Sequence, residues 1–317
     1  MPLVATGRTS RADEVLPGVW RLRLPLVWDE VPYANAWALA DGEGGCVLVD
    51  CGMAGDGMWE AFEEALGRAG WRPSDVSLLV CTHCHGDHYG LAAEVVDAAG
   101  CELWMHPDHG HLTAWRDDIP GLAAYRRERG RRAGAPERAL RWCADVSEEG
   151  PGVAGTVHPD RALAEGVEIS SALGRWVVVE SPGHAPSHVF LHQPEHGILV
   201  SGDYLIGAGR PFVEHGHGRE DPVTDYLASL DRAEGLGARL VLPGHGRPGG
   251  DVSARAGRAR RLIARDLDVI RARLRSGPAT PWELLVLLYE GSDLERAWMV
   301  PVVLAQLDHL AQRGEAA

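Results

Sequence analysis

The chain has 317 residues, of which 45% are hydrophobic and 24% charged, and its formal net charge is −14. This length is sufficient for one large domain or for two, and the composition is that of an ordinary soluble globular protein. The acidic balance disfavours a general polyanion-binding protein, although local basic patches can escape that average.

The N-terminal region and the cysteines bear on the expected compartment. The first twenty residues contain no continuous apolar segment, so we expect no signal peptide, and no apolar run reaches the roughly eighteen residues of a membrane span. The cysteines are therefore expected as free thiols in a reducing cytoplasm. They are Cys46, Cys51, Cys81, Cys84, Cys101 and Cys143. The absence of lysine beside abundant arginine, alanine and glycine is interpreted as the codon bias of a GC-rich bacterial genome.

Along the chain, apolar runs and helical patterns alternate in two halves. In the first half, strands are expected at 18–24, 35–50 and 76–80, and helices around 58–70 and 91–100. A polar, arginine-rich and helix-leaning insertion follows at 106–165. In the second half, strands are expected at 174–180, 187–193, 197–203 and 238–246, and a helix at 221–237. Two such halves predict sheets packed face to face with helices outside.

The turn after the strand at 76–80 carries three histidines and an aspartate within six positions. In an extended chain His83 and His85 project to the same side, whereas past Gly86 the backbone can turn and aim Asp87 and His88 elsewhere. Imidazole and carboxylate are the zinc ligands of hydrolytic sites, and four such groups could not easily be buried at one turn without a cation. The turn therefore predicts a metal site.

Three strand ends in the second half carry the same kind of side chain. His184, Asp203 and His245 each follow an apolar strand and each lie beside glycine, where a rigid sheet can present chemistry. The full set of predicted ligands is His83, His85, Asp87, His88, His184, Asp203 and His245. Seven ligands are enough for two metals if one carboxylate bridges them.

These motifs, in this order, resemble the metallo-β-lactamase superfamily over residues 17–250. The resemblance implies an α/β fold, namely an αββα sandwich, with one metal on His83, His85 and His184. It implies a second metal on Asp87, His88 and His245, with Asp203 bridging. Asp50, in the early Val-Asp-Cys-Gly motif, would support the metal-binding turn through hydrogen bonds.

The ligand set is similar to that of the glyoxalase-II-like branch, because Asp203 supplies a bridging carboxylate. The expected function is a dinuclear hydrolase in which a metal-bridging hydroxide cleaves a thioester, ester or lactone, with Asp87 and Asp203 as catalytic residues. Two zinc ions are expected, with iron or manganese as alternatives. The substrate is expected to be a small acyl compound, and a coenzyme A or acyl-carrier thioester is one form considered, as in thioesterases and cyclases. A native β-lactamase role is disfavoured.

The segment 251–317 is expected to form a helical C-terminal domain after a catalytic domain at 1–250. Residues 253–277 are amphipathic, and Thr280 and Ser292 begin capping boxes. These helices resemble the winged-helix appendage of a superfamily subset, and packing against the sandwich is preferred over nucleic-acid binding. Loop residues 212–218, which contain Glu214, His215 and His217, are interpreted as a pocket rim in preference to a third metal site.

Two arginine-rich segments, in the insertion and in residues 253–277, are interpreted as solvated faces in preference to anion contacts. Two rival functions remain open at this point. One is a metal-dependent phosphodiesterase or ribonuclease, and the other is a metal-stabilised scaffold without enzymatic activity. Nucleic acid is thus disfavoured without being excluded, no membrane partner is expected, and homo-oligomerisation is left open.

Overall fold

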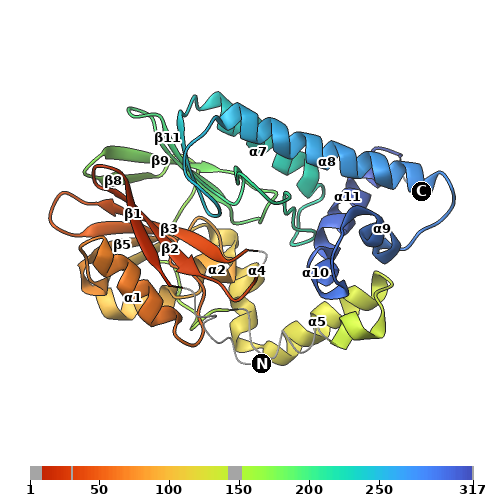
Figure 1. The fold of residues 1–317 in the computed structure, drawn as a ribbon, viewed down its shortest axis with the longest axis horizontal. Helices are drawn as coiled ribbons and strands as arrows, with labels where there is room; N and C mark the ends of the chain where they lie inside the picture. The colour runs from red at the N-terminus through yellow and green to blue at the C-terminus, as the bar shows by residue number, and fades with distance from the viewer. Residues whose placement is uncertain (1–8, 30, 142–151, 316–317) are drawn as a thin grey trace.

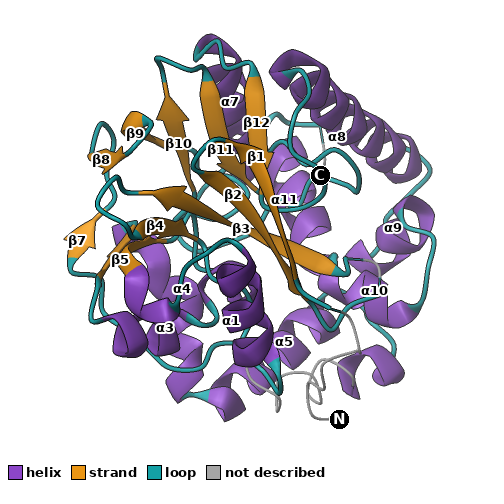
Figure 2. Ribbon diagram, turned by 60° about the vertical axis from the view of Figure 1, so that its left-hand side comes forward, coloured by secondary structure: helices purple, strands orange, loops and turns teal. Residues whose placement is uncertain are grey.

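Two β-sheets lie face to face with helices on both outer sides, as the sequence predicts (Figures 1 and 2). The computed structural model describes residues 9–29, 31–141 and 152–315. The predicted free thiol of Cys143 and part of the predicted insertion lie outside these residues. The other five cysteines are free. The architecture is the αββα sandwich of a mixed α/β protein.

The first sheet has its strands in sequence order from β1 to β7. They are β1 (Arg11–Leu16), β2 (Val19–Pro25), β3 (Tyr33–Ala40), β4 (Cys46–Val49), β5 (Val76–Val80), β6 (Glu102–Met105) and β7 (Arg161–Ala162). The strands from β1 to β4 pair antiparallel, and those from β4 to β7 pair parallel. Parallel neighbours need crossovers, which here contain α1 (Met58–Arg68) and α3 (Ala92–Ala99). Their apolar faces cover the outer side of this sheet.

The second sheet has the order β12-β11-β10-β9-β8. Its strands are β8 (Glu168–Ser171), β9 (Gly174–Glu180), β10 (Val189–Gln193), β11 (Ile198–Gly202) and β12 (Leu240–Pro243). Only β11 and β12 pair parallel, and α7 (Pro222–Gly235) connects them. Strands β1, β7 and β8 were not predicted, since β1 and β8 are polar and largely exposed and β7 has two residues.

The apolar layer between the sheets fixes their alignment. Trp37 and Val49 from the first sheet pack in one core cluster with Trp176 and Val200 from the second. All four side chains are excluded from solvent, so their apolar area stabilises the face-to-face packing. Because of this alignment, the turns after β4, β5, β11 and β12 meet at one edge of the sandwich.

The segment at 106–141 is mainly helical, as predicted for the insertion. It contains α4 (Gly110–Thr113) and α5 (Ile119–Arg132), with short 3-10 turns at Pro107–His109 and Ala114–Asp117. A further 3-10 turn at Pro73–Asp75 precedes β5. The predicted insertion also contains β7, which extends the first sheet by pairing with β6, so this part belongs to the sandwich itself.

Four helices follow the sandwich, and they lie together at one end of the molecule (Figure 1). They are α8 (Val252–Leu274), α9 (Pro281–Leu288), α10 (Asp293–Trp298) and α11 (Val300–Gln312). The predicted apolar face of α8, with Ile263, Leu267 and Ile270, shares one core cluster with α7 and the second sheet. The capping box at Thr280 is present. Among the described residues no strand follows β12, so the winged-helix likeness is limited to helices, and the division into two domains stays a prediction.

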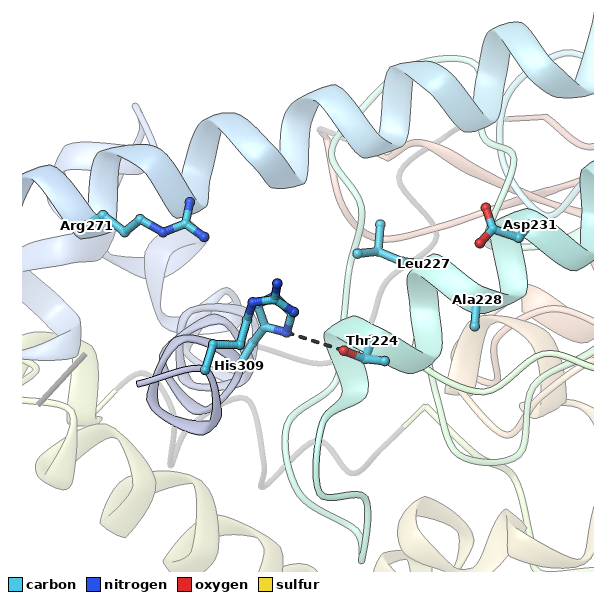
Figure 3. A pocket seen from close by; sticks show the side chains of 7 residues that line it. Thr224, Leu227, Ala228, Asp231, Arg271 and His309 are labelled. Carbon is cyan, nitrogen blue, oxygen red and sulfur yellow. Dashed lines mark hydrogen bonds between the residues drawn. The ribbon is translucent and has the colours of Figure 1, made fainter. Parts of the chain in front are cut away.

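A pocket of about 400 Å³ lies between α7, α8 and α11 (Figure 3). Thr224, Arg271 and His309 are among the residues that line it, and none of the seven predicted ligands does. Within the described ranges, every helix is too short or too polar to cross a lipid bilayer.

Candidate metal centre

The turn after β5 separates its four polar side chains into two pairs. Cys81 to His85 continue in extended or irregular conformation, and helix α2 (Gly86–Tyr89) then begins with His85 as its N-cap. His83 and His85 therefore precede the helix, whereas Asp87 and His88 lie on it. Gly86 has no positive φ, so the change of direction that the sequence predicted comes from the start of the helix. All four side chains are buried or nearly so.

The first group consists of three histidines whose ring nitrogens form a small triangle. His83 Nε2 lies 3.0 Å from His85 Nδ1, and His184 Nε2 lies 3.2 and 3.0 Å from these two atoms. The outer nitrogen of each ring has another partner. His184 Nδ1 donates to the carbonyl oxygen of Phe212 at 3.0 Å, and His85 Nε2 lies 3.4 Å from a Glu214 oxygen.

The outer nitrogen of His83 is also accounted for. The Thr82 hydroxyl donates to Asp50 at 2.9 Å, so its oxygen can accept from His83 Nδ1 at 3.0 Å. These partners assign the N–H of each ring to its outer nitrogen. Three lone pairs then point at one another across 3.0–3.2 Å, which is unfavourable unless a cation lies among them. This triangle fits a divalent metal ion.

The second group lies beside the first and combines two histidines with a carboxylate. His88 Nδ1 donates to Asp50 at 2.9 Å, and His245 Nδ1 donates to the carbonyl oxygen of Tyr33 at 3.0 Å. Their free Nε2 atoms lie 3.5 and 3.1 Å from the same Asp87 oxygen. Lone pairs on these nitrogens would face an anionic oxygen, so the group requires a positive charge there, either a proton on the ring or a metal ion.

Asp203 lies between the two groups. Its oxygens are 3.2 Å from His88 Nε2, 3.3 Å from His245 Nε2 and 3.7 Å from His184 Nε2. His88 Nε2 and one Asp203 oxygen are buried without a hydrogen-bond partner among the described residues. A Cβ at Gly244 would lie 2.2 Å from that oxygen, so the close approach of the β12 turn requires glycine.

Asp50 fixes the orientation of the turn. One of its oxygens accepts from the Thr82 backbone N–H at 2.7 Å, and the other accepts from the Thr82 hydroxyl and from His88 Nδ1, both at 2.9 Å. Asp50 is buried and adopts a positive φ of 63°, a conformation that is uncommon outside glycine. The structure thus places Asp50 in the supporting position that the resemblance implied.

The electrostatics differ between the two groups. Burial and the neighbouring imidazoles hold the pKa of His83 well below its usual range. Burial also lowers the pKa of His184 to about 4, so both rings stay neutral and keep a lone pair for a metal ion. At His245, by contrast, Asp203 and Asp87 outweigh burial and raise the pKa to about 10. The carboxylates thus attract positive charge to the second group.

Several supporting side chains were not predicted from the sequence. His188 Nε2 accepts from the backbone N–H of Asp203 at 3.2 Å. Asn35 donates to the carbonyl oxygens of Pro243 and Gly246, and it accepts from Arg21 at 2.8 Å, which holds the turn that carries His245. The position of His188, four residues after a predicted ligand, was the one sequence signal for it. Nothing local in the sequence marks Asn35.

Cys84 and Cys81 have the spacing Cys-x-x-Cys, yet both thiols are free and buried within this turn. Cys84 Sγ lies 3.3 Å from His111 Nε2. Of the loop residues interpreted as a pocket rim, Glu214 and His217 lie in this neighbourhood, whereas His215 pairs with Asp308 at 2.9 Å.

The chain is similar to known proteins over the region that holds these side chains. The family profile described as the Metallo-beta-lactamase superfamily matches residues 30–245. The chain is 29% identical over 217 residues to the probable metallo-hydrolase YqjP of Bacillus subtilis, which covers 63% of this chain and 64% of that protein. It is 31% identical over 186 residues to the acyl-coenzyme A thioesterase MBLAC2 of Gallus gallus, which covers 56% of this chain and 58% of that protein.

The chain thus spans somewhat less than two thirds of the length of these curated relatives. A solved structure of a metallo-β-lactamase family protein from Thermus thermophilus superposes with a TM-score of 0.82 at 29% identity, over 95% of both chains. That similarity extends over almost the whole chain.

Proposed function

This chain belongs to the metallo-β-lactamase superfamily, and from that premise we propose that it is a metal-dependent hydrolase that cleaves acyl thioesters. The observation that carries the proposal is the pair of adjacent donor groups with Asp203 between them. Adjacent groups of this kind suit two cations that act together on one substrate.

We assign the cations to the donor groups by their geometry. His83, His85 and His184 would hold the first cation. Asp87, His88 and His245 would hold the second, with Asp203 bridging. Nitrogen and oxygen donors of this kind suit zinc, and iron and manganese accept the same donors. Cations held by these residues would supply two effects, a lowered pKa of a water molecule and polarisation of a carbonyl oxygen.

The chain's own residues prepare this chemistry in three ways. Hydrogen bonds from outer ring nitrogens hold each imidazole in the tautomer that directs its lone pair inwards. Asp203 links the two groups, because its oxygens face His88 and His245 of the second group and one of them also lies 3.7 Å from His184 Nε2 of the first. One Asp87 oxygen lies 3.1 Å from His245 Nε2. From there it can accept a hydrogen bond from the attacking water and so orient that water.

The thioester class rests on the similarity to the acyl-coenzyme A thioesterase of Gallus gallus. Esters and lactones present the same carbonyl group and belong to the same proposal, and acyl-carrier thioesters are a variant of it. The arginines give little support to the ribonuclease alternative, because many of them have partners within the fold. Arg131 and Arg132 pair with Glu128, and Arg260 pairs with Asp231.

The test is a substrate panel assayed with the full chain, with and without chelator. The panel contains acyl-coenzyme A thioesters, nitrophenyl esters, a lactone, a nitrophenyl phosphodiester and single-stranded RNA. We expect thioester hydrolysis that chelation abolishes and added zinc restores. Cleavage of the phosphodiester or RNA alone, or thioester hydrolysis that survives complete removal of metal, would refute the proposal.

A further inference from the structure

Several arginines lie beside the second donor group, around the turn that follows β12. Arg247 comes two residues after His245 in this turn, and Arg21 on β2 donates to a backbone carbonyl oxygen of the same turn at 2.5 Å. The guanidinium carbon of Arg23, also on β2, lies 4.5 Å from the ring centroid of Tyr33. The carbonyl oxygen of Tyr33 accepts from His245 Nδ1. These arginines therefore adjoin the candidate metal centre.

The strand pairing of the first sheet adds a fourth arginine. Residues in direct register on an antiparallel pair have Cβ atoms about 4.5–5.5 Å apart on one face of the sheet. Arg11 on β1 is in register with Arg23, and Asp13 is in register with Arg21. The first of these pairs places two like charges opposite each other, which is destabilising unless an anion lies near both. The arginine cluster is thus Arg11, Arg21, Arg23 and Arg247.

The positive charge of the arginine cluster is poorly balanced. Among the described residues, none of its four guanidinium groups forms an ion pair, and Arg23 Nε is buried without a hydrogen-bond partner. Burial, and then the charges of Arg23 and Arg247, outweigh Asp13 and lower the pKa of Arg21 to about 10. In a chain with a formal net charge of −14, such a local excess of positive charge indicates a site for an anion.

The backbone of the turn is held in place before any ligand binds. Arg255, in the first turn of α8, donates to the carbonyl oxygens of Arg247 and Gly249. Arg21 holds the same turn from the side of the first sheet. Because the turn is fixed from two sides, presenting the Arg247 side chain to a ligand requires little further ordering of the backbone.

We propose that Arg11, Arg23 and Arg247 bind the phosphate groups of a thioester of the coenzyme A class. This inference rests on the proposed function and names the form of substrate that the site selects. Guanidinium groups bind phosphate oxygens through paired N–H donors. A coenzyme A thioester carries its phosphates far from the thioester bond, so they can contact a cluster that adjoins the metal centre without entering it. A pantetheine thioester has the same reactive bond and lacks these phosphates.

The test compares two thioesters of the same acyl group, one on coenzyme A and one on pantetheine, with the zinc-loaded full chain. Wild-type protein should have a KM at least about tenfold lower for the coenzyme A thioester, and added salt should reduce this advantage. Arg23→Gln and Arg247→Gln should each remove most of it. Arg175→Gln is the matched control and should keep it, because Arg175 pairs with Glu168 at the edge of the second sheet opposite β12.

The wild-type comparison needs no substitution, so it decides the matter even if a variant fails to fold. Equal KM values for the two thioesters in wild-type protein would overturn the proposal, and so would an undiminished advantage in folded Arg23→Gln and Arg247→Gln. If neither thioester is hydrolysed, the proposed function fails separately. Isothermal titration with adenosine 3′,5′-bisphosphate then measures the arginine cluster directly. Weaker binding by Arg247→Gln than by Arg175→Gln would support the phosphate site, and equal binding would overturn it.

Discussion

Replacing Asp203 with asparagine removes a negative charge from between the two donor groups and leaves the side-chain shape nearly unchanged. Asp203 oxygens lie 3.2 and 3.3 Å from the Nε2 atoms of His88 and His245, so a cation held by these donors would lie within about 4 Å of the carboxylate. Two unit charges at that distance interact by about 4 kcal/mol at an effective dielectric constant of 20, and a dication doubles this to about 8 kcal/mol.

Asparagine costs less to bury than aspartate, which offsets part of that loss. If about half remains, the second cation is bound more weakly by about 4 kcal/mol, or roughly a thousandfold. The first cation keeps three imidazoles and should stay largely bound. Turnover should fall by orders of magnitude, because both cations are needed on one substrate.

Isothermal titration of the metal-free protein with zinc, followed by thioester assays, measures both effects. Asp231→Asn is the matched control, since its side chain is 74% exposed on α7 and should change neither quantity. Retention of both affinities and of wild-type turnover by Asp203→Asn would show that Asp203 does not bridge, and the mechanism would have to be rebuilt without it.

Three further substitutions test the supporting structure. Asp50→Asn removes the carboxylate that accepts from His88 Nδ1, so zinc affinity should fall by about 10–100-fold in the same titration, and an unchanged affinity would contradict this support. Arg210→Gln leaves the buried Asp266 carboxylate without its ion-pair partner. Urea unfolding should show a free energy of unfolding lower by about 2 kcal/mol, and an unchanged value would show that the pair does not stabilise the fold. Burial opposes ionisation of Asp221, but hydrogen bonds from the first turn of α7 and from α11 hold its pKa below the usual value. The ionised Asp221 therefore stabilises the fold above the unfolded pKa of about 3.9, and this stabilisation is lost as pH falls through the lower folded pKa. Asp221→Asn should lower the free energy of unfolding by about 1 kcal/mol at pH 7 and should leave it unchanged at the acid end of a pH series of unfolding curves. A cost that is the same at every pH would assign it to something other than the charge.

Most strands, and the strand ends that carry the candidate donor side chains, were predictable because a local sequence pattern marks each of them. An apolar, β-branched run at Val76–Val80 predicts a buried strand, and a polar residue directly after such a run is presented at the strand end. His184, Asp203 and His245 follow the same rule. Helix α9 was predictable for a similar reason, since Thr280 and Glu283 satisfy each other's backbone groups within one turn.

The surroundings of the donors were decided by tertiary structure alone. Phe212 supports His184 through a backbone carbonyl, a group that every residue possesses, so no sequence pattern can mark it. Asn35 reaches the turn of His245 from more than 200 positions away, and Glu214 reaches His85 from 129 positions away. Such contacts depend on how two sheets align over an apolar layer and on where the connecting loops then pass. The sequence by itself therefore determined which side chains could bind metal, and only the packing of distant segments decided which of their nitrogens face inwards and which partners hold them there.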